Sequence, residues 1–224
     1  MRSRQSRRGL STTFAGVYGE GTKVAMIDDS YVWKSRLRTG RAILRRKLRR
    51  AKVDPARVDA AFVQVEAFAF LTGYIIRKLL EAKKLSDELE AAVMNVVTYP
   101  ARPEYPLDFL SPHKIERGYD LTAPSEKAVG FRDLCNLLVH SFVFMPASDE
   151  SGTGWTGFFL NSDRTKNREL MFIKREDFDL LADEVVRDDV VTMHIDRLRS
   201  RVKKSRVGEG DAVPTISLNA DLND

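Results

Sequence analysis

Cysteine and histidine are scarce in this sequence. Its 224 residues include one cysteine, Cys135, and three histidines, His113, His140 and His194. A single cysteine cannot form a disulfide within the chain, which excludes the cystine framework of many small secreted domains. The histidines and the cysteine do not have the spacing of a zinc site. We therefore expect no metal or other cofactor, and we expect Cys135 to be a buried thiol in a cytoplasmic protein.

Long hydrophobic runs are also missing. Charged residues interrupt the longest apolar stretches before they reach the length of a membrane span. The first ten residues are rich in arginine and are followed by serine and threonine, without the apolar block of a secretory signal. These patterns predict a soluble protein that does not associate with membranes.

The chain is basic, and its positive charge is clustered. It has 37 basic and 32 acidic residues, and one cluster lies between Lys34 and Lys52. Such a cluster is either a solvated helix face or a surface that contacts phosphate groups. If it contacts nucleic acid, the residues that we expect to bind are Arg38, Arg41, Arg45, Arg46 and Arg49.

Hydrophobic periodicity and turn residues predict the secondary structure. The spacing of apolar residues predicts helices over residues 30–50, 56–84, 86–97, 126–140, 177–186 and 191–202. Three short apolar runs at 142–145, 155–160 and 170–173, separated by polar turns, predict an antiparallel meander. Four prolines in the stretch 99–112 predict a loop.

This order of elements predicts one domain that is mainly α: a helical bundle with a small antiparallel β-meander. We expect a basic N-terminal tail over 1–28 and the bundle over 29–145. The meander should follow over 146–175, C-terminal helices over 176–206, and a disordered tail over 207–224. A length of 224 residues and a hydrophobic share of 43% fit a single core.

The strongest candidate for chemistry is a row of polar residues on the predicted helix 126–140. Arg132, Asn136 and His140 are each four residues apart, so they share one face of a helix. Histidine can transfer protons near neutral pH, arginine can hold a phosphate, and an amide can orient either group. The alternative is structural: Asn136 and His140 hydrogen-bond at a helix end, where a histidine complements the helix dipole.

Two other groups of residues leave alternatives open. Glu66 and Arg77 lie eleven residues apart on the predicted helix 56–84, where they either hold helices in register or support the polar site. The aromatic residues Trp155, Phe158 and Phe159 either stack on bases or belong to the core.

The stretch Phe131–Phe142 follows a long helix that contains Val65–Phe70 and Ile76–Glu81, and together they resemble the HEPN superfamily of helical-bundle proteins. That superfamily is marked by an arginine, a polar residue directly after it, and a histidine further along the same helix. Arg132, Asp133 and His140 match these positions, with a longer spacing than is usual between the arginine and the histidine. Asn136 and His140 are an alternative functional pair, with Arg132 bracing them.

The resemblance implies a homodimer that cleaves RNA without a metal, in a toxin–antitoxin or phage-defence system with an antitoxin or another defence protein as partner. His140 would act as general base or acid and Arg132 would stabilise charge on the phosphoryl oxygens. Asp133, Glu66 and Arg77 would support them. One alternative is a non-catalytic bundle that binds nucleic acid or a protein through the basic helix; another is a purely structural role for Asn136 and His140.

Overall fold

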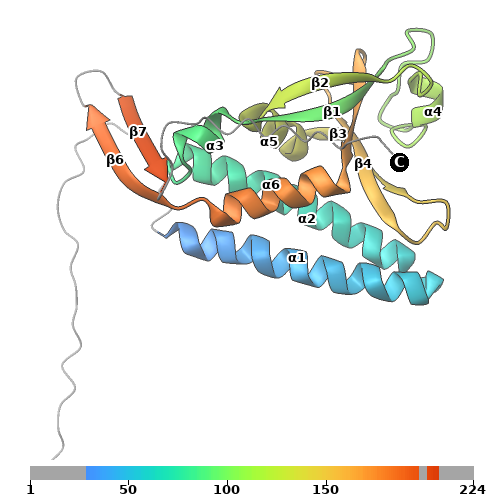
Figure 1. The fold of residues 1–224 in the computed structure, drawn as a ribbon. Coiled ribbons are helices and arrows are strands. Elements are labelled where there is room, and N and C mark those ends of the chain that lie inside the picture. Colours follow the sequence, from blue (N-terminus) through green and yellow to red (C-terminus); the bar gives the residue numbers. More distant parts are fainter. Residues whose placement is uncertain (1–28, 197–200, 207–224) are drawn as a thin grey trace, which may run out of the picture.

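The computed structural model describes residues 29–196 and 201–206, and the two expected tails, 1–28 and 207–224, lie outside these residues. Figure 1 shows the arrangement of the elements. In chain order they are α1 (Ser30–Val53), η1 (Pro55–Arg57), α2 (Val58–Glu81), α3 (Asp87–Ala91), β1 (Val93–Pro100), α4 (Ile115–Gly118), β2 (Ser125–Gly130), α5 (Phe131–Val139), β3 (Ser141–Ser148), β4 (Trp155–Ser162), β5 (Glu169–Lys174), α6 (Arg175–Arg187), β6 (Val190–Asp196) and β7 (Arg201–Arg206).

A five-stranded antiparallel sheet is the centre of the fold. Its strand order is β2-β1-β5-β4-β3, and β6 and β7 form a separate two-stranded hairpin. The helices α1, α2 and α6 lie alongside one another next to the sheet (Figure 1). The prediction of a mainly α helical bundle is therefore wrong: the fold is α+β, and it is not the bundle that the HEPN resemblance implied.

The error in fold class comes from two strands that were predicted as parts of helices. The helix predicted over 86–97 ends at Ala91, and the β-branched and aromatic residues after it form β1, whose buried and exposed residues alternate. The helix predicted over 126–140 is wrong in its first third, because Ser125–Gly130 is β2 and pairs with β1. Helix α5 begins only at Phe131.

The predicted meander is confirmed as three antiparallel strands, β3, β4 and β5. It is not an appendage, because β5 also pairs with β1 and so joins the meander to the rest of the sheet. The expected boundary between residues 145 and 146 falls inside β3. The last predicted helix, 191–202, is also wrong: strand β6 continues to Asp196 and β7 begins at Arg201.

Helices α1 and α2 confirm the predictions over 30–50 and 56–84. The side chain of Asp29 accepts a hydrogen bond from the backbone N–H of Tyr31 at the start of α1. Asp54 and Pro55 separate the two helices, with Pro55 in the first turn of η1, where its missing N–H costs nothing. Each helix buries a stripe of apolar residues at helical spacing.

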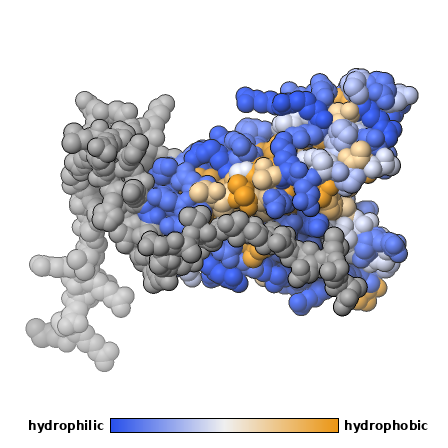
Figure 2. All heavy atoms as spheres, turned by 45° about the horizontal axis from the view of Figure 1, so that its top comes forward, coloured by the Kyte–Doolittle hydropathy of each residue, from blue (hydrophilic) through white to orange (hydrophobic). Residues whose placement is uncertain are grey.

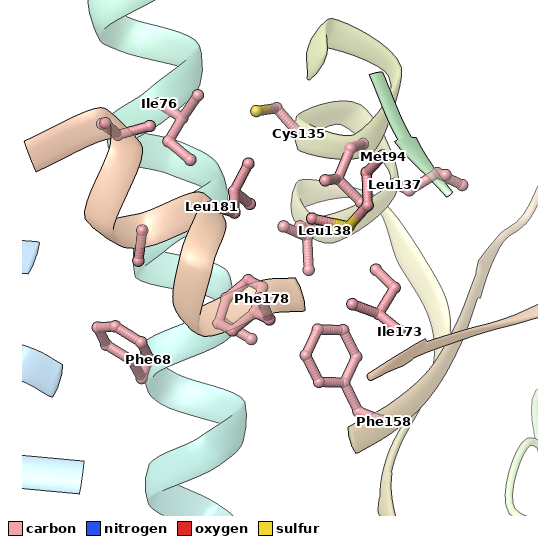
Figure 3. Packing of buried hydrophobic residues seen from close by; sticks show 14 of the residues in the cluster. Phe68, Ile76, Met94, Cys135, Leu137, Leu138, Phe158, Ile173, Phe178 and Leu181 are labelled. Carbon is pink, nitrogen blue, oxygen red and sulfur yellow. The ribbon is translucent and has the colours of Figure 1, made fainter. Parts of the chain in front are cut away.

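The main core lies between the helices and one face of the sheet. In Figure 3, Phe158 of β4 points toward Phe178 of α6, and their ring centroids are 5.1 Å apart. Phe178 in turn packs against Phe68 of α2 at 5.9 Å. Trp155 is also buried, so two of the three aromatic residues considered for base stacking belong to this core. Phe159 faces the other side of the sheet and packs in a second cluster, which includes Ile115 and Tyr119.

Helices α2 and α5 approach each other closely at Gly73. A β-carbon at this position would lie 2.6 Å from Cβ of Leu138, which cannot move without the α5 backbone. Gly73→Ala is therefore expected to lower the free energy of unfolding by about 1–3 kcal/mol, although alanine alone would favour the helix by about 1 kcal/mol. Urea denaturation measures the change. Gly130→Ala is the control, because nothing lies within 4 Å of its added carbon; equal losses in both variants would contradict the close contact.

Candidate functional site

A hollow of about 730 Å³ lies beside α5 and brings together residues from five parts of the chain. Helix α5 forms one wall and Arg77 of α2 contributes to it. The other walls come from β2, from the start of β5, and from the turn between β4 and β5. The residues that line it are Arg77, Lys127, Ala128, Val129, Gly130, Asp133, Asn136, Leu137, His140, Ser162, Asp163, Arg164, Thr165, Arg168, Glu169 and Met171. The hollow thus contains four of the six residues that the sequence predicted for catalysis or its support: Arg77, Asp133, Asn136 and His140.

Helix α5 presents Asp133, Asn136 and His140 to the hollow. Their spacing of three and four residues places them on one helical face. The opposite face of α5 buries Leu134, Cys135 and other apolar residues, which fixes the rotation of the helix. His140 is the C-cap residue, and its backbone N–H donates to the carbonyl of Asn136 at 2.9 Å.

Arg77 of α2 contacts the imidazole of His140. Its Nη1 lies 3.2 Å from Nε2 of His140. Because a guanidinium group can only donate, Nε2 accepts in this contact, and the ring proton of the neutral imidazole is on Nδ1. Nε of Arg77 also donates to Oε1 of Glu81 at 3.0 Å. Hydrogen bonds from Lys78 and Arg77 lower the pKa of Glu81, which keeps this carboxylate charged and able to hold Arg77 in place.

The turn between β4 and β5, residues 163–168, supplies further cations. Its backbone is held by hydrogen bonds from the N–H groups of Lys166 and Arg168 to the carbonyls of Ser162 and Thr165. Arg168 donates to the carbonyl oxygen of Arg164 at 3.2 Å, and both arginine side chains line the hollow. Within the described part of the chain, neither arginine forms an ion pair with a carboxylate. The turn therefore offers two charged groups that an anion could neutralise.

The hollow also contains carboxylates. Glu169 pairs with Lys127 across the sheet, and Asp163 pairs with Lys166 at 2.6 Å. Asp133 has no ion pair with any residue that the structure describes. The lining as a whole therefore carries both signs of charge, with cations in excess by one. It can bind an anionic group and place an imidazole and a carboxylate next to it.

Two residues predicted for the site lie elsewhere. Arg132 is not among the residues that line the hollow, and its Nη2 donates to Oε1 of Glu90 at 3.1 Å. It therefore points toward α3, and Arg77 is the arginine that contacts His140. Glu66 lines a different hollow with His113 and Phe142. The structure does not bring Glu66 together with Arg77.

The cations of the hollow that the sequence did not reveal are Lys127, Arg164 and Arg168. They lie on a strand and on a turn that only the sheet brings to α5. The stretch 161–167 was predicted as a polar turn; Arg164 lies within it and Arg168 directly follows it, and these two arginines were the available signal. Among the described residues, no group of three or more His, Cys, Asp and Glu side chains could hold a metal ion.

Cys135 lies on the buried face of α5 and is confirmed as a buried thiol; Figure 3 shows it on α5 among core residues. Burial raises its pKa to about 12, so the reactive thiolate is rare at neutral pH. We expect no labelling by a thiol reagent at pH 8 in the folded protein and complete labelling in denaturant. Mass spectrometry after timed exposure to iodoacetamide measures this. Rapid labelling of the native protein would contradict the packing of α5.

A second candidate surface is α1 itself. Between Lys34 and Lys52 this helix carries ten basic residues and no acidic residue. Seven of them form no ion pair with a carboxylate in the part of the chain that the structure describes. Lys52 is one of the seven; a hydrogen bond from Ser151 lowers the pKa of Asp149, and the charge of Lys52 lowers it further. We call the other six the basic face of α1: Arg36, Arg38, Arg46, Lys47, Arg49 and Arg50. All six side chains are exposed.

Not every predicted nucleic-acid-binding residue belongs to this face. Arg41 is only 14% exposed and is held by Asp179 and Asp183 of α6, so it joins the two helices. Arg45 is 45% exposed and lies 3.8 Å from a carboxylate oxygen of Asp179. The other three predicted residues, Arg38, Arg46 and Arg49, belong to the basic face.

Comparison with known proteins gives no match: no family model, no curated protein and no solved structure is similar to this chain. The resemblance to the HEPN superfamily therefore stays a prediction from the residues of α5.

Proposed function

We propose that this protein binds nucleic acid along the basic face of α1. The observation that supports the proposal is the composition of the helix: ten basic residues, no acidic residue, and seven cations without an ion pair among the described residues, six of them in the basic face. Charges that serve only to hold a fold are usually paired, as Arg41 is with α6. Unpaired cations arranged along one rigid helix can neutralise a row of phosphates and release their counterions.

The expected binding is independent of base sequence. Between Arg36 and Lys52, α1 has no asparagine, glutamine or aromatic residue. It therefore lacks the amides that read adenine and the rings on which unpaired bases stack, although arginine can also contact guanine. The residues Arg36 to Lys52 span about 24 Å at 1.5 Å per residue. That length matches contact with several phosphates of one nucleic-acid strand or duplex.

The proposal predicts similar affinities for unrelated sequences and a steep dependence on salt. We expect labelled RNA duplexes of two unrelated sequences to bind within about threefold of each other. For six phosphate contacts, affinity should fall about 10³-fold between 50 and 200 mM salt. Fluorescence anisotropy measures both quantities, with a DNA duplex as a third ligand. Affinity that does not change with salt, or strong preference for one sequence, would contradict the proposal.

RNA cleavage without a metal is a second candidate function, and the observation that favours it is the contact between Arg77 and His140. An imidazole that can accept a proton lies next to a guanidinium that can hold a phosphate. Asn136 lines the same hollow, as do Arg164 and Arg168. These groups could hold a phosphodiester at the imidazole.

The proposed step is attack of an RNA 2′-oxygen on its neighbouring phosphorus. Arg77 would turn from His140 to the phosphate, which frees Nε2 of His140 to take the proton of the 2′-hydroxyl. The bond between phosphorus and the 5′-oxygen then breaks, and the leaving oxygen takes a proton from solvent. The products are a 2′,3′-cyclic phosphate and a 5′-hydroxyl. Arginine side chains stabilise the charge that develops on the phosphoryl oxygens.

A further inference from the structure

A second apolar stripe runs along the outer face of α2, opposite the residues that this helix buries. It consists of Ala60, Val63, Ala67, Leu71 and Tyr74, spaced by three and four residues, and all five are exposed. Val63 is 64% exposed and Tyr74 is 45% exposed. On the face drawn in Figure 2, most of the described surface is hydrophilic and exposed apolar residues form small patches. Five exposed apolar residues in one row along a helix are an unusual feature of a protein surface.

The two apolar faces explain why α2 is so hydrophobic. The segment Pro55–Glu81 has a window of mean hydropathy 1.3, and 44% of that window is buried. By length and composition alone this helix could cross a membrane. That is weak evidence for a membrane span, because one face of the helix packs in the core. Packing in the core covers only one of the two apolar faces of α2. The outer face remains open to a partner.

We propose that a second copy of this chain covers the stripe, with the two α2 helices antiparallel and Ala67 at the two-fold axis. In this arrangement Ala67 meets the same residue of the other copy, Val63 meets Leu71, and Ala60 meets Tyr74. Large side chains thus lie opposite small or medium ones, and the alanine at the axis lets the helices approach closely. A surface that matches itself in this way is what a two-fold interface requires.

Charge at the two ends of the stripe favours the antiparallel direction. Asp59 stands just before the stripe and Lys78 just after it. In an antiparallel pair, Asp59 of each copy lies within about one helical turn of Lys78 of the other. In a parallel pair, like charges would meet. Asp59 forms no ion pair with the residues that the structure describes, so its carboxylate is available. At the other end of the stripe Arg77 and Lys78 share the single carboxylate of Glu81, which leaves one positive charge in excess there.

The size of the stripe sets the expected strength of the dimer. From Ala60 to Tyr74 it is about 21 Å long, which gives a smaller interface than the roughly 800 Å² per partner of stable complexes. Beside the stripe, Trp33 of α1 packs against Tyr74, with ring centroids 6.3 Å apart. We therefore expect a reversible dimer whose population rises with concentration.

Disulfide cross-linking tests the arrangement. Ala67→Cys places two thiols next to each other at the axis, and mild oxidation should convert most of the protein to a covalent dimer on a non-reducing gel. Ala60→Cys is the matched control on the same stripe, because its two copies would be about 21 Å apart. A mixture of Ala60→Cys and Tyr74→Cys chains should cross-link again. The native thiol, Cys135, is buried and should not take part.

Three outcomes would overturn the proposal. Equal cross-linking of Ala67→Cys and Ala60→Cys would indicate a parallel pair or random collision. A mass of 25.4 kDa at every concentration in sedimentation equilibrium would show that the protein is a monomer. Flotation of the protein with phosphatidylcholine vesicles, lost in Leu71→Glu, would assign the stripe to lipid. The expected result is a mass that rises toward twice 25.4 kDa in the native chain and does not rise in Ala67→Arg, with unchanged circular dichroism.

Discussion

Replacing Arg46, Arg49 and Arg50 with glutamine is expected to weaken RNA binding roughly 10²-fold at about 50 mM salt. All three belong to the basic face of α1, and none forms an ion pair among the residues that the structure describes. Each substitution removes one charge that can neutralise a phosphate. Glutamine has nearly the helix propensity of arginine, so α1 should remain folded. Fluorescence anisotropy with a labelled RNA duplex gives the dissociation constants.

The control for this variant must remove the same charge elsewhere. Lys84, Lys114 and Lys174 lie outside α1 and do not line the hollow. Replacing these three with glutamine lowers the net charge equally, and we expect a loss of affinity of no more than about threefold, since distant charges are screened. Similar losses in both triple variants would show that binding follows the total charge of the protein. The role proposed for α1 would then be abandoned.

His140→Ala is expected to reduce cleavage of RNA by at least about 10²-fold, the usual contribution of a general acid or base. Arg77→Ala should have an effect of similar size, because Arg77 is the arginine that contacts His140. Arg132→Ala should change the rate little, since Arg132 is bound to Glu90 outside the hollow. The measurement is the rate of cleavage in the presence of a chelator, with product ends identified by mass spectrometry.

His113→Ala is the matched control, because His113 is an exposed histidine that lines another hollow. It should retain the native rate. Equal activity of His140→Ala and the native protein, with unchanged circular dichroism, would remove the cleavage proposal. If the native protein binds RNA but leaves it intact, the hollow has no role in cleavage, and binding along α1 is unaffected.

The sequence predicted the parts of the fold that have strong local patterns. Helices α1 and α2 repeat apolar residues at helical spacing over 24 residues each, and α6 does so over 13. The runs that became β3, β4 and β5 are separated by clear polar turns. Strands β1 and β2 could not be recognised in the same way, because their paired residues lie between 27 (Thr98 and Ser125) and 37 (Val93 and Gly130) positions apart in the chain. The strands β6 and β7 were hidden by a spacing that also fits a helix.

Only the part of the candidate site that lies on a single helix could be predicted from the sequence. The face of α5 that presents Asn136 and His140 follows from their spacing. The positions of Lys127 and Arg168 depend on which strands pair with one another, and this pairing cannot be read from a local sequence pattern. Arg41 shows the same limit on α1: Arg38, three residues before it, has no ion pair among the described residues, but two carboxylates of α6, more than 130 residues away in the chain, hold Arg41.

The most direct test of the basic face is the salt dependence of binding in the native protein and in the triple variant. The slope of log K against log salt concentration counts the phosphates that a protein neutralises, at about 0.9 for each contact. Loss of Arg46, Arg49 and Arg50 should make the slope shallower by about 2.7. Two parallel lines would show that these side chains do not touch phosphate, and that result would contradict the account.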